Sequence, residues 1–178
     1  MKKTSWLAAA AALTLSAGLA TAFHAASAAS AGAPKPAPMP ASAAMPADHV
    51  MLTPADLKWG PAPGALPPGA MVVVLDGDPF AAGLYTSRLK LPAGYKIPAH
   101  SHPADEHVTV ISGSFYMGLG DKLDPAKSTM MLPGSFAVMK QGTRHFAWSK
   151  EESIIQFHGM GPWGINYVNP ADDPRTKK

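Results

Sequence analysis

The chain of 178 residues contains no cysteine. This absence excludes disulfide bonds, thiolate metal ligands, a cysteine nucleophile and a lipid anchor attached through an N-terminal cysteine. Stability must therefore come from a hydrophobic core, which a domain of this length can build. The length itself predicts one domain with extensions rather than two full domains.

The chain also lacks a strong excess of charge. It has 15 Lys and Arg against 12 Asp and Glu, which gives a formal net charge of +3. Two of the lysines, Lys2 and Lys3, belong to a predicted leader, and their removal lowers the charge to +1. A nearly neutral chain gives no support for a nucleic-acid partner.

A long hydrophobic run is missing as well. The apolar segment at 7–19 is shorter than the roughly 20 residues that a membrane-spanning helix needs. With the lysines before it and small residues after it, residues 1–28 have the pattern of a secretory signal that is cleaved after Ala22 or Ala28. No Arg-Arg pair is present, so we expect general export, a periplasmic or secreted protein and no membrane span.

The rest of the chain divides by composition. Residues 29–49 are rich in Ala and Pro and predict a disordered linker, because such a segment buries too little apolar surface to offset its ordering entropy. The folded domain is expected over 50–170. Residues 171–178 predict a polar, solvated tail.

A sustained helical period is absent from the folded part. Only residues 53–59 predict a helical turn, with Thr53 as its cap and Pro54 at its first position. Short runs rich in β-branched and aromatic residues alternate with glycine- and proline-rich turns, which is typical of an all-β sandwich or barrel. The predicted strands cover 71–75, 85–91, 95–100, 106–111, 114–119, 136–140, 145–148 and 153–159.

The stretch HSHPADEHVTV at 100–110 concentrates metal-ligand side chains. His100 and His102 are two residues apart, so both imidazoles point to one side of an extended segment. Glu106 shares a strand face with Val108 and Val110, and a carboxylate buried with them is costly unless it is paired or metal-bound. Two imidazoles and a carboxylate that face one interior suit a divalent transition metal. His145 follows a strand and a glycine turn and is the natural fourth ligand.

These residues resemble a known family pattern. The first segment has the spacing of the first signature motif of the cupin superfamily, with Gly94, His100, His102, Glu106 and Gly113 in the family positions. The second segment, with Gly134, Gly142 and His145, is similar to the second motif. Lys140 stands where a turn proline is usual, and the absence of that proline would loosen the turn. Ser149 stands where an asparagine is common, so the hydrogen bonds around the ligands do not carry over from the family.

The resemblance covers residues 70–160 and implies a double-stranded β-helix, the jelly-roll barrel of cupins. It implies a metal held by His100, His102, Glu106 and His145. Asp105 and His107 have the opposite strand parity to Glu106 and are expected to face solvent or to support the ligands. The family also tolerates one more residue before its carboxylate, an alternative that would make His107 the ligand.

Side chains for the wall of a substrate pocket are harder to assign. Gln156 and His158 share one face of the last long strand, and on an inward face they would be the candidate catalytic residues, as a proton shuttle or substrate anchors. The alternative is an outer face in contact with solvent. Tyr116, Phe136 and Trp148 are candidates for an aromatic pocket wall, with core packing as the alternative.

An outward aromatic patch is also predicted. Phe146 and Trp148 have the opposite parity to His145, so they would face away from the metal. Such a patch requires a cover, either the N-terminal segment or a second subunit, which leaves a homodimer open.

Three histidines and one carboxylate leave one or two metal coordination positions for water, dioxygen or a substrate. We therefore expect a dioxygenase-type enzyme that acts on a small organic molecule. Its expected metal is iron or manganese, although such ligands also accept zinc, nickel and copper. The alternative is a non-catalytic metal-binding or ligand-sensing cupin. An enzyme should keep a polar wall beside the metal, whereas a sensing site should be closed by apolar residues.

Overall fold

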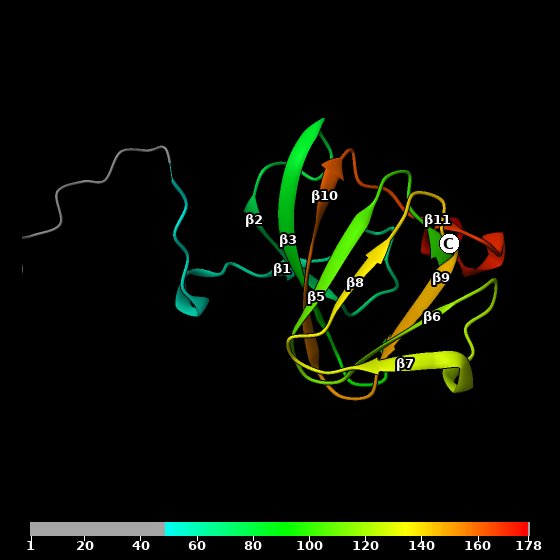
Figure 1. Ribbon diagram of the computed structural model, residues 1–178. Helices are drawn as coiled ribbons and strands as arrows, with labels where there is room; N and C mark the ends of the chain where they lie inside the picture. The colour runs from blue at the N-terminus through cyan, green and yellow to red at the C-terminus, as the bar shows by residue number, and fades with distance from the viewer. Residues whose placement is uncertain (1–48, 178) are drawn as a thin grey trace, which may run out of the picture. The chain divides into compact units, whose positions relative to one another are not determined.

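The structure, a computed structural model, describes residues 49–177, which form β-strands joined by short loops (Figure 1). The predicted signal and nearly all of the predicted linker lie outside these residues. The strands are β1 (Gly60–Pro61), β2 (Met71–Asp76), β3 (Gly83–Leu91), β4 (Lys96–Ser101), β5 (Glu106–Ser112), β6 (Phe115–Leu119), β7 (Ser128–Met131), β8 (Phe136–Met139), β9 (His145–Ser149), β10 (Ser153–Gly161) and β11 (Asn166–Tyr167). The expected all-β class is confirmed.

The strands form two antiparallel sheets. One sheet has the order β1-β2-β3-β10-β5-β8, and the other has the order β11-β4-β9-β6-β7 (Figure 1). All eight predicted strands are present. The prediction missed β1 and β11, which have two residues each, and β7, a four-residue edge strand beside β6.

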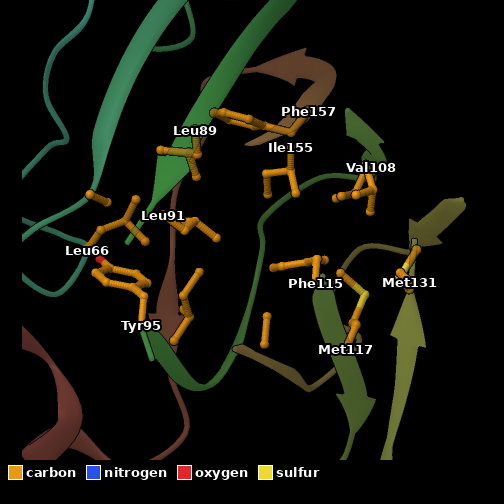
Figure 2. Packing of buried hydrophobic residues seen from close by; sticks show 14 of the residues in the cluster. Leu66, Leu89, Leu91, Tyr95, Val108, Phe115, Met117, Met131, Ile155 and Phe157 are labelled. Carbon is orange, nitrogen blue, oxygen red and sulfur yellow. The ribbon is translucent and has the colours of Figure 1, made fainter. Parts of the chain in front are cut away.

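The hydrophobic core contains residues from both sheets. Along β3, side chains alternate so that Tyr85, Ser87, Leu89 and Leu91 are buried. Figure 2 shows Leu89 and Leu91 of β3 in one buried cluster with Ile155 of β10. Phe115 and Met117 of β6 belong to the same cluster. Each large apolar side chain buried in this way stabilises the fold by about 1.5–3 kcal/mol relative to an exposed one.

A bulge in β4 prepares the position of the first histidine. The pairing of β4 with β9 shifts register between Ile97 and His100, and Pro98 lies inside that interval. Proline cannot donate to the sheet ladder and is tolerated at such bulges. The extra residue leaves both Ala99 and His100 buried.

Four short 3-10 helices complete the fold: η1 (Pro54–Asp56), η2 (Pro125–Lys127), η3 (Pro170–Asp172) and η4 (Pro174–Thr176). The turn predicted after Thr53 is therefore confirmed as η1. The carboxylate of Asp56 accepts hydrogen bonds from the Thr53 backbone N–H at 2.8 Å and from its hydroxyl at 2.6 Å. Among residues 49–177, no helix has the length and apolar character required to cross a bilayer.

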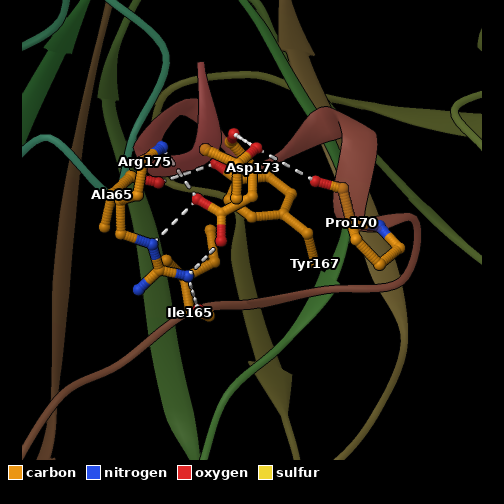
Figure 3. Close-up of polar contacts among 7 residues, drawn as sticks. Ala65, Ile165, Tyr167, Pro170, Asp173 and Arg175 are labelled. Atoms are coloured by element: carbon orange, nitrogen blue, oxygen red, sulfur yellow. Dashed lines mark hydrogen bonds and ion pairs between the residues drawn. The ribbon is translucent and has the colours of Figure 1, made fainter. Parts of the chain in front are cut away.

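The C-terminal residues are not the loose tail that their polarity predicted. The helices η3 and η4 return to the segment around β11, where Arg175 donates a hydrogen bond to the Ile165 carbonyl at 3.1 Å (Figure 3). Asp173 fixes that guanidinium at 2.7 Å, and the Tyr167 hydroxyl donates to the Ala65 carbonyl at 2.8 Å. These bonds to backbone carbonyls order a segment that has little apolar surface of its own.

Candidate metal centre

Three buried histidines converge in the structure. His100, His102 and His145 each offer a ring nitrogen, and the three nitrogens lie within 4.8 Å of one another. Their side chains are almost inaccessible to solvent, and the ring centroids are 4.2–5.2 Å apart. Such a group of neutral imidazoles is a suitable site for a transition metal.

The sheet and a glycine turn deliver these rings to one place. His100 in β4 is paired directly with His145, the first residue of β9. His102 follows the end of β4, and its carbonyl accepts a hydrogen bond from the N–H of Gly142 at 3.0 Å. Gly142 has φ of 78°, a left-handed conformation that glycine adopts without steric cost, and the turn therefore leads straight into His145.

The backbone fixes the orientation of each ring. The Nδ1 atoms of His100, His102 and His145 lie 2.7, 2.6 and 3.0 Å from carbonyl oxygens of Pro98, Gly164 and Thr143, respectively. Because a carbonyl oxygen only accepts, each Nδ1 must carry the proton and donate it. The Nε2 atom of a neutral ring then keeps its lone pair, and this hydrogen-bond arrangement is the one that surrounds metal-bound histidines.

Glu106 completes the interior cluster. It is the first residue of β5, and its carboxylate is buried. The indole N–H of Trp163 donates to its Oε1 at 3.1 Å, and its Oε2 lies 3.2 Å from Nε2 of His102. That Nε2 atom is buried and has no hydrogen bond of acceptable geometry. Two lone-pair atoms in contact require a proton or a cation between them, so the donor set fits a bound metal.

The charges of the metal-free cluster follow from burial and from this contact. Burial lowers the pKa of His100 to about 3 and also lowers the pKa of His145. Burial also lowers the pKa of His102, but the Glu106 carboxylate raises it by more, so its pKa lies above the ordinary value. The pKa of Glu106, which burial would raise, falls to about 2 because of His102, His145 and the Trp163 bond.

The cavity beside the cluster is small and mostly apolar. It has a volume of about 30 Å³, which is room for about one or two water molecules. Apart from the four polar residues of the cluster, the lining side chains are Leu66, Leu89, Ile97, Val108, Phe115, Met117, Ala147, Ile155, Phe157, Trp163 and Ile165. No lysine or arginine among the described residues lines it.

Gln156 and His158 do not line this cavity, so their expected place in a polar wall is wrong. The inward residues of β10 are Ile155 and Phe157, and the alternate residues face outward. Gln156 accepts a hydrogen bond from Arg88 at 3.1 Å and borders a different depression, on the outer face near Asp76. The interior of the barrel is apolar here, so the apolar members of the strand occupy it.

The three aromatic pocket candidates also lie elsewhere. Tyr116 and Trp148 stack on the outer sheet face, with centroids 3.9 Å apart and planes at 12°. Phe136 is largely exposed and borders a separate groove of about 490 Å³ between β7 and β8. None of the three lines the histidine cavity among the described residues.

The outward parity of Phe146 and Trp148 is confirmed, and within the described residues the chain itself covers Phe146. Trp148 donates to the Ser128 hydroxyl at 3.1 Å, and Phe146 is completely buried. A methyl group added to Gly118 would lie 2.3 Å from the Phe146 ring and 2.8 Å from the Lys127 carbonyl. Residues 127–128 therefore cover part of this outer face.

The two departures from the family motif have structural replacements. Lys140 does not loosen its turn, because its ammonium group and the Gln141 N–H both bind the Asp105 carboxylate at 2.8 Å. Ser149 is fully buried and donates its hydroxyl to the Pro92 carbonyl at 2.7 Å. The contacts with Asp105 join the first motif to the second, and the Ser149 bond ties the second motif to the residues just before the first.

His107 is excluded as an interior ligand. It pairs with His158 across β5 and β10 on the outer face, while Glu106 points inward. Trp163 and Gly164, which bind Glu106 and His102, were not predicted from the sequence. They lie about 60 residues further along the chain, after β10, and no ligand spacing identifies them.

Comparisons with known proteins agree with this architecture. A family model described as the ChrR cupin-like domain matches residues 47–164. The chain is 32% identical over 85 residues to germin-like protein subfamily 3 member 1 of Arabidopsis thaliana. That match covers 45% of the chain and 41% of the plant protein, so the chain spans less than half of this relative's length.

Two solved structures share the fold at low sequence identity. The polyketide cyclase RemF from Streptomyces resistomycificus is 18% identical with a TM-score of 0.55, and the match covers 70% of this chain and 88% of RemF. A candidate acetylacetone dioxygenase from Methylibium petroleiphilum is 20% identical with a TM-score of 0.54, and covers 71% and 85%, respectively. These matches establish the cupin-like barrel and nothing about the reaction.

Proposed function

Because the chain belongs to the family of ChrR cupin-like domains, we propose that it holds one divalent transition metal through His100, His102, His145 and Glu106 and presents it to a small organic molecule. The orientation of the three rings carries the proposal. Each Nδ1 is committed to a backbone carbonyl, which leaves three Nε2 lone pairs beside a buried carboxylate.

Glu106 is proposed as the fourth ligand. Its Oε1 is occupied by the Trp163 indole, and its Oε2 faces the unpartnered Nε2 of His102. A cation shared between these two atoms would remove the need for a proton there. We propose iron or manganese; bound metal of this kind would supply Lewis acidity and redox chemistry of the dioxygenase type.

The ligand class follows from the lining of the cavity. A charged group is costly in an apolar interior without a partner, and among the described residues no cationic side chain faces the cavity. The proposed ligand is therefore uncharged and largely apolar, with one or two oxygen atoms for the metal. The cavity of about 30 Å³ is too small for such a ligand. Binding would therefore require lining side chains, such as Met117 or Phe157, to move.

Ser87 offers a second polar anchor. Its hydroxyl is fully buried and has no partner among the described residues. It faces an apolar cavity of about 40 Å³ whose lining shares Leu66, Leu89, Phe157 and Trp163 with the histidine cavity. A ligand that extends from the metal past Phe157 would place one hydrogen-bonding group at Ser87.

A non-catalytic, ligand-sensing role is the second candidate, favoured by the closed apolar surroundings of the histidines. Metal analysis and oxygen consumption separate the two candidates. We expect stoichiometric iron or manganese in protein purified from its own host. Oxygen uptake with acetylacetone or a similar uncharged diketone as the probe would support the enzyme, whereas stoichiometric zinc without oxygen uptake would support sensing.

We also propose that the protein is exported. The support is the sequence pattern of residues 1–28, with its two lysines, apolar segment and small residues. N-terminal sequencing of the mature protein from a periplasmic or culture-medium fraction should find Phe23 or Ala29 first. Full-length protein that starts at Met1 and stays in the cytoplasm would contradict export.

A further inference from the structure

A second pair of histidines lies outside the proposed interior site. His107 of β5 and His158 of β10 are direct cross-strand partners on the outer face of the six-stranded sheet. Their ring centroids are 4.9 Å apart, and both side chains are half-buried. The sheet separates them from the interior cluster, because Glu106, the neighbour of His107, points to the opposite face.

The spacing of this pair matches the spacing within the interior cluster. The centroid distances there are 4.2, 4.9 and 5.2 Å, so the outer pair falls inside that range. Its ring planes are inclined by 30° rather than stacked flat. Two imidazoles at this distance can direct one nitrogen each toward a common ion.

The backbone beneath the pair is rigid. β10 lies between β3 and β5, and β5 lies between β10 and β8, so both histidines belong to strands that are paired on each side. Their direct neighbours in the same row are Thr86 and Val138, which carry no charge that would repel a cation. The sheet therefore fixes the backbone positions of the two histidines.

One further weak donor lies two residues along β10 from His158. The Met160 side chain has the parity of His158, is 57% exposed and carries a thioether. Both histidines are partly exposed to solvent, so water can fill the remaining positions. Imidazole nitrogens with water or a thioether suit copper, nickel and zinc rather than magnesium or calcium.

We propose that His107 and His158 form a second, solvent-facing metal site for a divalent ion such as Cu²⁺, Ni²⁺ or Zn²⁺, with water completing the coordination. This site shares no residue with the proposed interior centre, so each can fail without the other.

The test uses Cu²⁺ as the probe and the full-length protein with His102→Ala, which weakens the interior site. Copper binding is followed by equilibrium dialysis and by the electron paramagnetic resonance signal of nitrogen-coordinated Cu²⁺. We expect one copper per chain. Adding His158→Gln or His107→Gln should weaken binding by at least about tenfold, because even loss of an outer-shell partner costs metal sites about 10- to 100-fold.

His49→Gln is the matched control, because His49 borders the depression near Thr86 and Gln156 on the same side of the sheet but is not part of the pair. It should leave copper affinity unchanged. Circular dichroism verifies that each variant keeps its fold. If both glutamine variants bind copper as well as the His102→Ala parent, the proposal is overturned, and the two rings only pack against each other.

Discussion

Trp163 donates its indole N–H to Oε1 of Glu106 at 3.1 Å, across 57 residues of sequence. The next residue, Gly164, accepts the hydrogen bond from Nδ1 of His102 at 2.6 Å. Two consecutive residues after β10 therefore orient a histidine and a carboxylate that face each other. The same segment also supplies Trp163 and Ile165 to the lining of the cavity.

Trp163→Phe should weaken metal binding while the fold survives, because phenylalanine keeps an aromatic ring in the cavity wall but cannot donate to Glu106. The expected loss of affinity is about 10- to 100-fold, measured by competition with a chromophoric chelator. The control is Trp148→Phe, which removes a comparable bond to Ser128 on the outer face. Equal metal affinity in both variants would show that the bond to Glu106 does not orient a ligand.

His102→Ala should remove most of the tightly bound metal, whereas His107→Ala should retain it. The two side chains point in different directions: His102 is buried with the other two imidazoles, whereas His107 faces outward. Metal that remains after dialysis against a weak chelator is measured by elemental analysis. The opposite result would mean that the ligand register along 100–107 is wrong.

Metal affinity should decrease as the pH falls, with the release of one proton on binding. The Glu106 carboxylate raises the pKa of His102 above its ordinary value despite burial, so His102 holds a proton that the metal must displace. The pKa of His100 is about 3 and that of Glu106 about 2, so neither competes near neutrality.

The affinity should therefore fall about tenfold per pH unit below the pKa of His102 and level off above it. Metal titrations between about pH 5.5 and 8.5 cover the ordinary range of histidine ionisation and check this slope. A slope of two protons would show that His145 is also protonated. A flat profile would show that no proton is shared between His102 and Glu106.

Gly118→Ala should reduce the free energy of unfolding by about 1–3 kcal/mol, the usual cost of overpacking. The added methyl group would lie 2.3 Å from the Phe146 ring, which is fully buried and cannot move away freely. Gly60→Ala is the control, because nothing lies within 4 Å of its added methyl group. Urea denaturation compares them, and equal stability would mean that the Phe146 ring is loosely packed.

The strands and the inward direction of His100, His102 and Glu106 could be predicted from the sequence. Strand alternation and the spacing between ligands are both encoded within a few residues. The sequence did not predict which face of β10 is interior. Ile154, Gln156 and His158 form a mixed face, and Ile155 and Phe157 form a wholly apolar one; burial of the apolar face decides the matter.

Contacts between distant segments could not be predicted either. Lys140 was expected to loosen its turn because proline was absent, but Asp105 stabilises the turn from 35 residues away. Trp163 and Gly164 reach the histidines only because β10 returns the chain to β5. Such partners depend on the completed sheet and leave no local pattern in the sequence.

The chain has no cysteine with which to cross-link itself, yet its ligand residues come from two segments that are about 40 residues apart. An ion held by His100 and His145 would close that loop as a reversible staple. Restricting a loop of this length in the unfolded chain is worth several kcal/mol in the disulfide case, about 3–5 kcal/mol. Unlike a disulfide, the staple would not be cleaved by thiol reductants but would be removed by chelators, so metal supply would contribute to the stability of the folded protein.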